Sequence, residues 1–147
     1  MRHTLLYLSF LLVIVATGCL KTTQKSDPVP APSGTFSGQY ARYHRHTGIG
    51  AWDTVKTNLT VKFSTTDNTY AVTGATTTIH ANSYGTFTMA SPYIGFADVT
   101  YSSTDTSKVA HLVGYYDYSY DGTNLTMYAS SSDTLVLGYA LKKVTTN

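Results

Sequence analysis

Residues 54–64 read TVKTNLTVKFS, and their polar and apolar side chains alternate with a period of two. One side of an extended chain over this stretch carries Val55, Thr57, Leu59, Val61 and Phe63. The other side carries only polar side chains, two of them lysines. Successive side chains of a β-strand point to opposite faces. The stretch therefore predicts a long strand with one buried face, of the kind found in antiparallel sheets.

Shorter stretches with the same alternation lie on both sides of this strand, separated by turn residues. Asp67-Asn68 and Asp121-Gly122 are dipeptides that favour tight hairpins. The polar residues 102–108 form the longest expected loop. Alternation between these turns predicts further strands over residues 36–44, 69–74, 76–80, 84–90, 93–99, 109–120, 124–130 and 134–144.

Composition points to the same fold class. The chain has 147 residues, which is the size of one ordinary domain. It contains 26 threonines and 13 tyrosines but no glutamate. Threonine and tyrosine are common in strands, whereas glutamate is common on the exposed faces of helices. The net charge of +2 is too small for a protein that binds nucleic acid by neutralising phosphates. We therefore predict an all-β domain and no nucleic-acid partner.

The short turns indicate how the strands are arranged. Strands that follow one another in sequence usually pair. A series of about eight such strands closes naturally into a barrel, which leaves no sheet edge exposed. We expect an antiparallel up-and-down β-barrel over residues 35–147. A two-sheet β-sandwich has the same alternation and is the alternative.

The start of the chain indicates where the protein resides. Residues 1–19 read MRHTLLYLSFLLVIVATGC. Their apolar run is about twelve residues long, which suits a secretory signal peptide and is too short for a membrane-spanning helix, which needs roughly twenty. The run ends in small residues followed by Cys19, the single cysteine of the chain. A lone cysteine forms no internal disulfide.

The segment Ala16-Thr17-Gly18-Cys19 resembles the lipobox of bacterial lipoproteins. The resemblance implies a signal peptide over residues 1–18 and a lipid attached to the sulfur of Cys19. A proline-rich linker then runs through residues 19–34. Leu20 follows the cysteine where an inner-membrane retention signal would have aspartate. We therefore expect a membrane-anchored protein in the envelope of a Gram-negative bacterium, on the outer membrane.

The rest of the chain resembles small lipocalin-like lipoproteins of the Bacteroidota type. The resemblance rests on Gly34–Gly38, on the strand–turn–strand segment 116–127 and on the closing residues 138–143. It implies a binding module for a small apolar or amphipathic ligand. Two alternatives are a structural or protein-interaction lipoprotein with a filled core, and a surface lipoprotein that binds carbohydrate. We expect the protein to be a monomer.

The tyrosine-rich segment 115–120 supplies the candidate ligand-binding residues. Alternation places Tyr116, Tyr118 and Tyr120 on one uncharged face, which is the better candidate for the interior. Tyr139 on the last strand faces the same interior. Rings and hydroxyls in such a row could line a pocket or stack on a flat ligand. The alternative is that these tyrosines only pack across neighbouring strands.

Histidines are the remaining candidates for metal binding or catalysis. His44 and His46 share one strand face, as metal ligands often do, and His80 and His111 could join them. Without glutamate or a second cysteine we predict no metal site and no cofactor. No nucleophile elbow or phosphate loop is present, and we predict no catalytic residues and no enzymatic activity. A pocket that brought His44 or His111 beside an aspartate would reopen the question of catalysis.

Overall fold

A computed structural model describes residues 29–45, 50–75, 77–104, 109–131 and 134–145. The predicted signal peptide and Cys19 lie outside these residues. Within the described residues, no helix is long and apolar enough to span a membrane. Eight strands lie within them: β1 (Gly34–Arg45), β2 (Trp52–Ser64), β3 (Thr69–Thr73), β4 (Tyr84–Ala90), β5 (Tyr93–Asp98), β6 (Gly114–Tyr120), β7 (Asn124–Ser131) and β8 (Leu135–Lys143).

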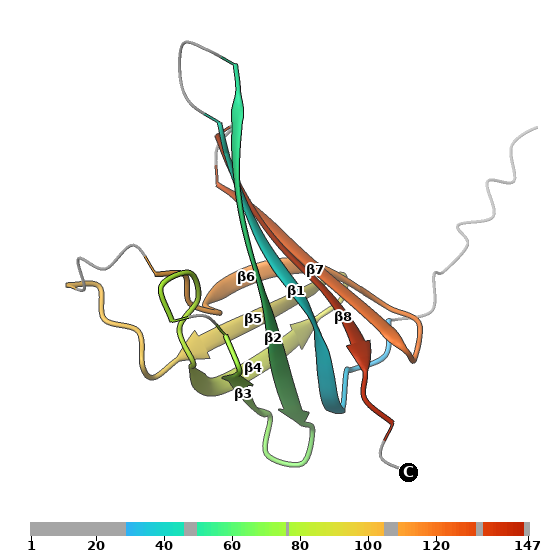
Figure 1. Cartoon of the computed structure of the whole chain (residues 1–147). Helices are drawn as coiled ribbons and strands as arrows, with labels where there is room; N and C mark the ends of the chain where they lie inside the picture. Colours follow the sequence, from blue (N-terminus) through green and yellow to red (C-terminus); the bar gives the residue numbers. More distant parts are fainter. Residues whose placement is uncertain (1–28, 46–49, 76, 105–108, 132–133, 146–147) are drawn as a thin grey trace, which may run out of the picture.

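The strands form a closed barrel in which each pairs antiparallel with the next (Figure 1). β8 returns to pair with β1, and this ladder runs from Phe36 opposite Lys143 to His44 opposite Leu135. The predicted up-and-down β-barrel is confirmed, and the alternative of a sandwich is wrong. The predicted inner face of β2 is also observed. Thr57, Leu59, Val61 and Phe63 are buried, and Val55 is half-buried.

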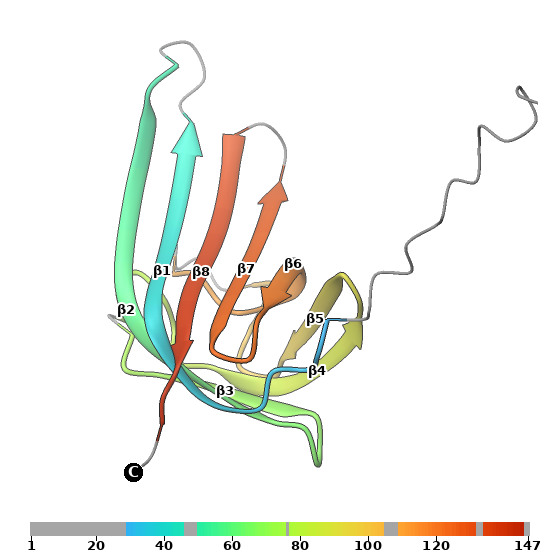
Figure 2. The ribbon, with the colours of Figure 1, turned by 90° about the vertical axis from the view of Figure 1, so that its right-hand side faces the viewer.

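Four strands continue beyond the closed part of the barrel (Figure 2). β1 pairs with β2 as far as Arg45 opposite Trp52, whereas the β2–β3 ladder begins only at Thr60. β7 and β8 likewise stay paired out to Ser131 opposite Leu135. We call this four-stranded part, formed by residues 41–45, 52–59, 129–131 and 135–138, the extension. Its inner face continues the inner wall of the barrel.

Two predicted strands are wrong in part. The described part of segment 76–80 forms a turn, and His80 makes a single isolated bridge to Ala110. The predicted strand 109–120 begins only at Gly114. Residues 77–83 and 109–113 instead lie together, and we call them the cap. Ala81 N donates to Ala110 O at 2.8 Å, and Ala110 N donates to Ile79 O at 2.9 Å. The cap inserts His80 and Leu112, both fully buried, into the barrel core.

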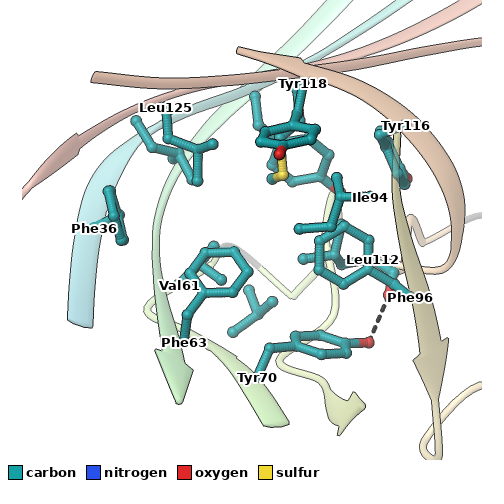
Figure 3. Packing of buried hydrophobic residues seen from close by; sticks show 14 of the residues in the cluster. Phe36, Val61, Phe63, Tyr70, Ile94, Phe96, Leu112, Tyr116, Tyr118 and Leu125 are labelled. Carbon is teal, nitrogen blue, oxygen red and sulfur yellow. Dashed lines mark hydrogen bonds between the residues drawn. The ribbon is translucent and has the colours of Figure 1, made fainter. Parts of the chain in front are cut away.

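The interior is filled largely by aromatic rings (Figure 3). The Phe63 ring packs edge-on against Phe36 and Phe87, with centroids 5.7 and 5.4 Å away. The Tyr70 hydroxyl donates a 2.6 Å hydrogen bond to the Leu112 carbonyl and so fastens the cap to β3 (Figure 3). An eight-stranded barrel is just wide enough for its own side chains to fill. The packed rings of the core therefore stabilise the closed shape of the barrel.

Candidate functional site

All four predicted ligand-binding tyrosines lie on the inner face of the barrel. Tyr116, Tyr118 and Tyr139 are buried, and Tyr120 is half-buried against the core. They are divided between two regions of the interior. Tyr118 and Tyr120 lie toward the barrel end where β1 begins. Tyr116 and Tyr139 lie closer to the cap, as their contacts show below.

Tyr118 and Tyr120 have their hydroxyls engaged by backbone. The Tyr118 hydroxyl donates to the Val29 carbonyl at 2.8 Å, and Val29 itself packs against the core. The Tyr120 ring lies edge-on to Phe36 at 5.5 Å, and its hydroxyl donates to the Gly122 carbonyl at 2.9 Å. These two residues close their end of the barrel with contacts inside the chain.

Tyr116 and Tyr139 belong to a compact group of four rings, which we call the tyrosine–histidine cluster. Its members are Tyr40 of β1, His80 of the cap, Tyr116 of β6 and Tyr139 of β8. The Tyr40 ring lies 4.8 Å from His80 and 5.0 Å from Tyr139. The Tyr116 ring lies 5.6 Å from Tyr139. All four side chains are at most 2 % exposed, so their polar atoms are out of reach of bulk water.

The hydrogen bonds of His80 determine which of its nitrogens carries the proton. Nδ1 lies 2.7 Å from the Ala81 carbonyl oxygen, which can only accept, so Nδ1 donates. Nε2 lies 2.8 Å from the Tyr139 hydroxyl and is left to accept the proton of that hydroxyl. Burial lowers the pKa of His80, which favours this neutral form. The cluster therefore holds a neutral imidazole between the cap backbone and β8.

Two hydroxyls of the cluster are left without hydrogen bonds. Tyr40 Oη and Tyr116 Oη are buried and have no partner among the described residues. The Tyr139 hydroxyl and the Val113 backbone lie near enough to the Tyr116 hydroxyl to lower the pKa of Tyr116, but neither makes a hydrogen bond with it. Burial dominates and raises the pKa of both Tyr40 and Tyr116 to about 12. A buried hydroxyl without a partner costs about 1–3 kcal/mol, and such groups in native proteins commonly hold a water or a ligand.

A positive charge borders the cluster where the closed barrel meets the extension. Arg42 follows Tyr40 by two residues and lies on the same inner face of β1. Its charge lowers the pKa of Tyr40, against the larger effect of burial. Val55 of β2 and Leu137 of β8 flank Arg42 in register, and both are half-buried. Along β1, the inner face thus changes from the aromatic ring and hydroxyl of Tyr40 to the positive charge of Arg42, which has an apolar side chain on each side.

Sequence reasoning missed Tyr40 and His80 as members of this cluster. Tyr40 could have been found, because it alternates with Phe36 on a predicted strand and so faces inward. His80 could not, because the alternation of residues 76–80 predicts a separate strand there. Its place depends on a loop that folds over the barrel and pairs with Ala110, far away in sequence.

His111 does lie beside an aspartate, which is the arrangement that would reopen the question of catalysis. Its Nδ1 is 2.8 Å from Asp98 Oδ2, and the two side chains are 9 % and 0 % exposed. The other Asp98 oxygen accepts from both the Thr100 amide and hydroxyl, at 2.7 and 2.6 Å. The hydrogen bonds of the described residues bring no serine or threonine hydroxyl to His111. We therefore interpret the pair as a clamp between β5 and the cap.

Other polar features of the surface are separate from the cluster. Two shallow hollows share Asn58 and Gly74, beside the point where β3 leaves β2, and a third is lined in part by Asp67 and Tyr70. None of the four predicted tyrosines lines these three hollows. Within the described ranges, no three His, Asp or Cys side chains gather closely enough to hold a metal ion. His46 lies outside those ranges.

Comparison with family models, with curated proteins and with solved structures found no match to this chain.

Proposed function

We propose that the protein is a lipid-anchored lipoprotein of the Gram-negative envelope that binds a small amphipathic ligand. The lipid on Cys19 would hold it to the outer membrane, and the barrel would be the binding module. The observation that carries the ligand proposal is the pair of buried hydroxyls without partners, Tyr40 Oη and Tyr116 Oη. The proposal includes no catalytic step, no cofactor and no nucleic-acid partner.

The chemistry of the cluster favours one kind of ligand. The two tyrosine hydroxyls can donate to an acceptor such as a carboxylate or a carbonyl oxygen. The positive charge of Arg42 next to Tyr40 favours an acceptor with negative charge. Val55 and Leu137 offer apolar contacts on either side of Arg42. A molecule with an acceptor head and a short apolar tail fits this order of side chains.

A filled core with a purely structural role is the second candidate, and the ring packing favours it. Tyr40, His80 and Tyr139 are in mutual contact at 4.8–5.7 Å between ring centroids, which leaves little space between them. A ligand would then have to shift these rings. In this candidate the two hydroxyls are satisfied by single waters or remain a small cost in stability.

Substitution of Tyr40 and Tyr116 by phenylalanine separates the two candidates. The full chain is purified from cell envelopes in mild detergent, and native mass spectrometry records any bound small molecule. For the ligand-binding candidate, we expect a bound species in the wild type that is lost or reduced in Tyr40→Phe and Tyr116→Phe. Tyr120→Phe is the matched control, because the bond from its hydroxyl to Gly122 is exposed.

The opposite result would support the filled core. With a filled core, no bound species is found in the wild type. Where the core also leaves the Tyr40 hydroxyl without a water, its removal in Tyr40→Phe raises the free energy of unfolding by about 1–3 kcal/mol. Chemical denaturation of both variants measures this directly. Such an increase, with no ligand in the wild type, would rule out the proposed binding module.

The anchor has its own test. Cys19→Ser removes the sulfur that would accept the lipid and leaves the apolar run and the barrel sequence unchanged. We expect incorporation of a clickable fatty acid in the wild type and none in Cys19→Ser, with loss of partition into the detergent phase after cleavage. Equal labelling of the two proteins would show that Cys19 is not the anchor.

A further inference from the structure

The outer surface of the barrel is divided by charge. The outward side chains of β1, β2 and β8 include the cations Arg45, Lys56, Lys62 and Lys142. The outward side chains of β4–β7, all of them described, include a single charged group, Asp117. The remaining outward residues of β4–β7 are tyrosine, threonine, serine, asparagine, alanine and glycine. This half of the barrel is therefore nearly neutral and rich in hydroxyls, although the chain as a whole is basic.

Three exposed tyrosines lie close together on this neutral face. Tyr93 of β5, Tyr115 of β6 and Tyr128 of β7 are 48 %, 76 % and 55 % exposed. Asp117 pairs in register with Tyr93 on one side and with Tyr128 on the other. The two rings therefore flank the carboxylate across a span of two strand spacings, about 10 Å. We call these four residues the tyrosine platform.

Gly95 holds the third ring down on the sheet. It pairs with Tyr115 and faces outward, yet it is buried, because the ring lies over it. A Cβ built on Gly95 would be 2.7 Å from Tyr115 Cε1 and 3.0 Å from the Thr88 hydroxyl. Only glycine leaves room for this ring position. The Cδ1–Cε1 side of the Tyr115 ring thus lies over Gly95, while most of the side chain remains open to solvent.

The side chains of the tyrosine platform favour one class of ligand over others. Tyrosine rings that lie on a flat surface can stack on apolar C–H faces, and their hydroxyls bind polar groups at the ring edge. A carboxylate between two rings accepts hydrogen bonds and repels anions. Anionic lipid surfaces and nucleic acids are disfavoured because the face lacks cations. Neutral sugars have both apolar C–H faces and many hydroxyl donors.

We propose that the tyrosine platform is a binding site for a neutral oligosaccharide, with Tyr93, Tyr115 and Tyr128 stacking on sugar rings and Asp117 accepting hydrogen bonds from their hydroxyls. This site is on the outside of the barrel and does not depend on the ligand proposed for the interior. Failure of either proposal leaves the other in place.

Isothermal titration calorimetry of the full chain tests the proposal. The chain is kept in lauryldimethylamine oxide, because that detergent has no sugar headgroup. Cellohexaose and maltohexaose are the neutral probes, and oligogalacturonate of the same length is the anionic probe. We expect binding of at least one neutral probe, weaker binding of the anionic one, and an affinity at least about tenfold lower in Tyr115→Ala.

Two variants control for nonspecific effects. Tyr84→Ala removes another exposed tyrosine, 60 % exposed, from the outward face of β4 and should bind like the wild type. Gly95→Ala keeps all three rings but forces the Tyr115 ring to move, and it should lose affinity at unchanged thermal stability. Equal loss in Tyr84→Ala and Tyr115→Ala would overturn the proposal.

Two other outcomes would also overturn it. The first is that none of the three probes binds the wild type. The second is that sedimentation shows a dimer that the triple variant Tyr93→Ala, Tyr115→Ala, Tyr128→Ala dissociates, which would assign the platform to a second copy of the chain.

Discussion

The His80 imidazole and the Tyr139 hydroxyl meet at 2.8 Å inside the barrel, although 59 positions separate them in the sequence. This hydrogen bond joins the cap to the last strand. His80 is held on its other side by the Ala81 carbonyl, so the imidazole cannot turn away without losing a bond. The Tyr139 hydroxyl of β8 therefore helps to hold the cap over the core, together with the Tyr70–Leu112 and His111–Asp98 contacts.

Removal of that hydroxyl should loosen the cap. Tyr139→Phe keeps the ring but leaves His80 Nε2 as a buried acceptor with no donor, and we expect a loss of about 1–3 kcal/mol in the free energy of unfolding. Urea denaturation measures it. Tyr120→Phe, whose hydroxyl bond to Gly122 is exposed, should change stability by much less. Equal losses of unfolding free energy in the two variants would show that the His80–Tyr139 bond contributes no more to stability than an exposed hydrogen bond.

Stability should fall in mild acid because of His80. Burial lowers its pKa in the folded protein, so below the unfolded value of about 6.5 only the unfolded chain binds this proton. The stabilisation that neutral His80 gives the folded protein is therefore fully present above pH 6.5 and is lost as the pH falls. The free energy of unfolding then decreases by at most about 1.4 kcal/mol per pH unit. His80→Gln should remove this slope between pH 6.5 and 5. An unchanged slope in His80→Gln would show that another titrating group causes the loss of stability in acid.

Alkaline solution should unfold the barrel steeply. Burial raises the pKa of Tyr40 and Tyr116 to about 12 and also raises that of Tyr70 and Tyr139. Above pH 10 the unfolded chain releases these protons and the folded chain retains them, so stability falls as the pH rises. Absorbance at 295 nm should show the four buried tyrosines ionising only together with loss of the β-sheet circular dichroism signal. Their ionisation before unfolding would contradict this prediction.

Two strand glycines should respond differently to alanine. A Cβ on Gly38 would collide with the Ala140 carbonyl oxygen on β8, whereas a Cβ on Gly138 meets nothing within 4 Å. We expect Gly38→Ala to cost about 1–3 kcal/mol through strain at the β1–β8 seam. Gly138→Ala should be neutral or stabilising by about 0.4–1 kcal/mol, because alanine restricts the unfolded chain. Thermal unfolding of the two variants checks this contrast, and similar costs would show that the seam is not tightly packed.

Most of the barrel could be predicted because local alternation and turn residues determine it. The alternation of β2 and the hairpin at Asp121-Gly122 both depend on neighbours in sequence. The two errors lie in the cap, where a short alternating segment resembles a strand. Its residues 77–83 instead pair with residues 109–113, and no local pattern encodes this long-range contact.

The sequence predicts which side chains of the candidate site point into the barrel, but not which of them meet there. Alternation correctly placed Tyr116 and Tyr139 inside, but their partners depend on which strands close the barrel. Tyr40 meets Tyr139 only because β1 pairs with β8, and the register of that pairing is a property of the closed sheet. The tyrosine platform was missed for a similar reason. Tyr93 and Tyr128 come together only through their shared neighbour Asp117.

The bond from the Tyr118 hydroxyl to the Val29 carbonyl has a consequence for how far the protein stands from the bilayer. It fixes residue 29 to the barrel end where β1 begins, so the tether to the proposed anchor is only the ten residues from Cys19. Ten residues reach at most about 35 Å. With the proposed anchor at Cys19, the barrel end that holds residue 29 would then stay within that distance of the lipid.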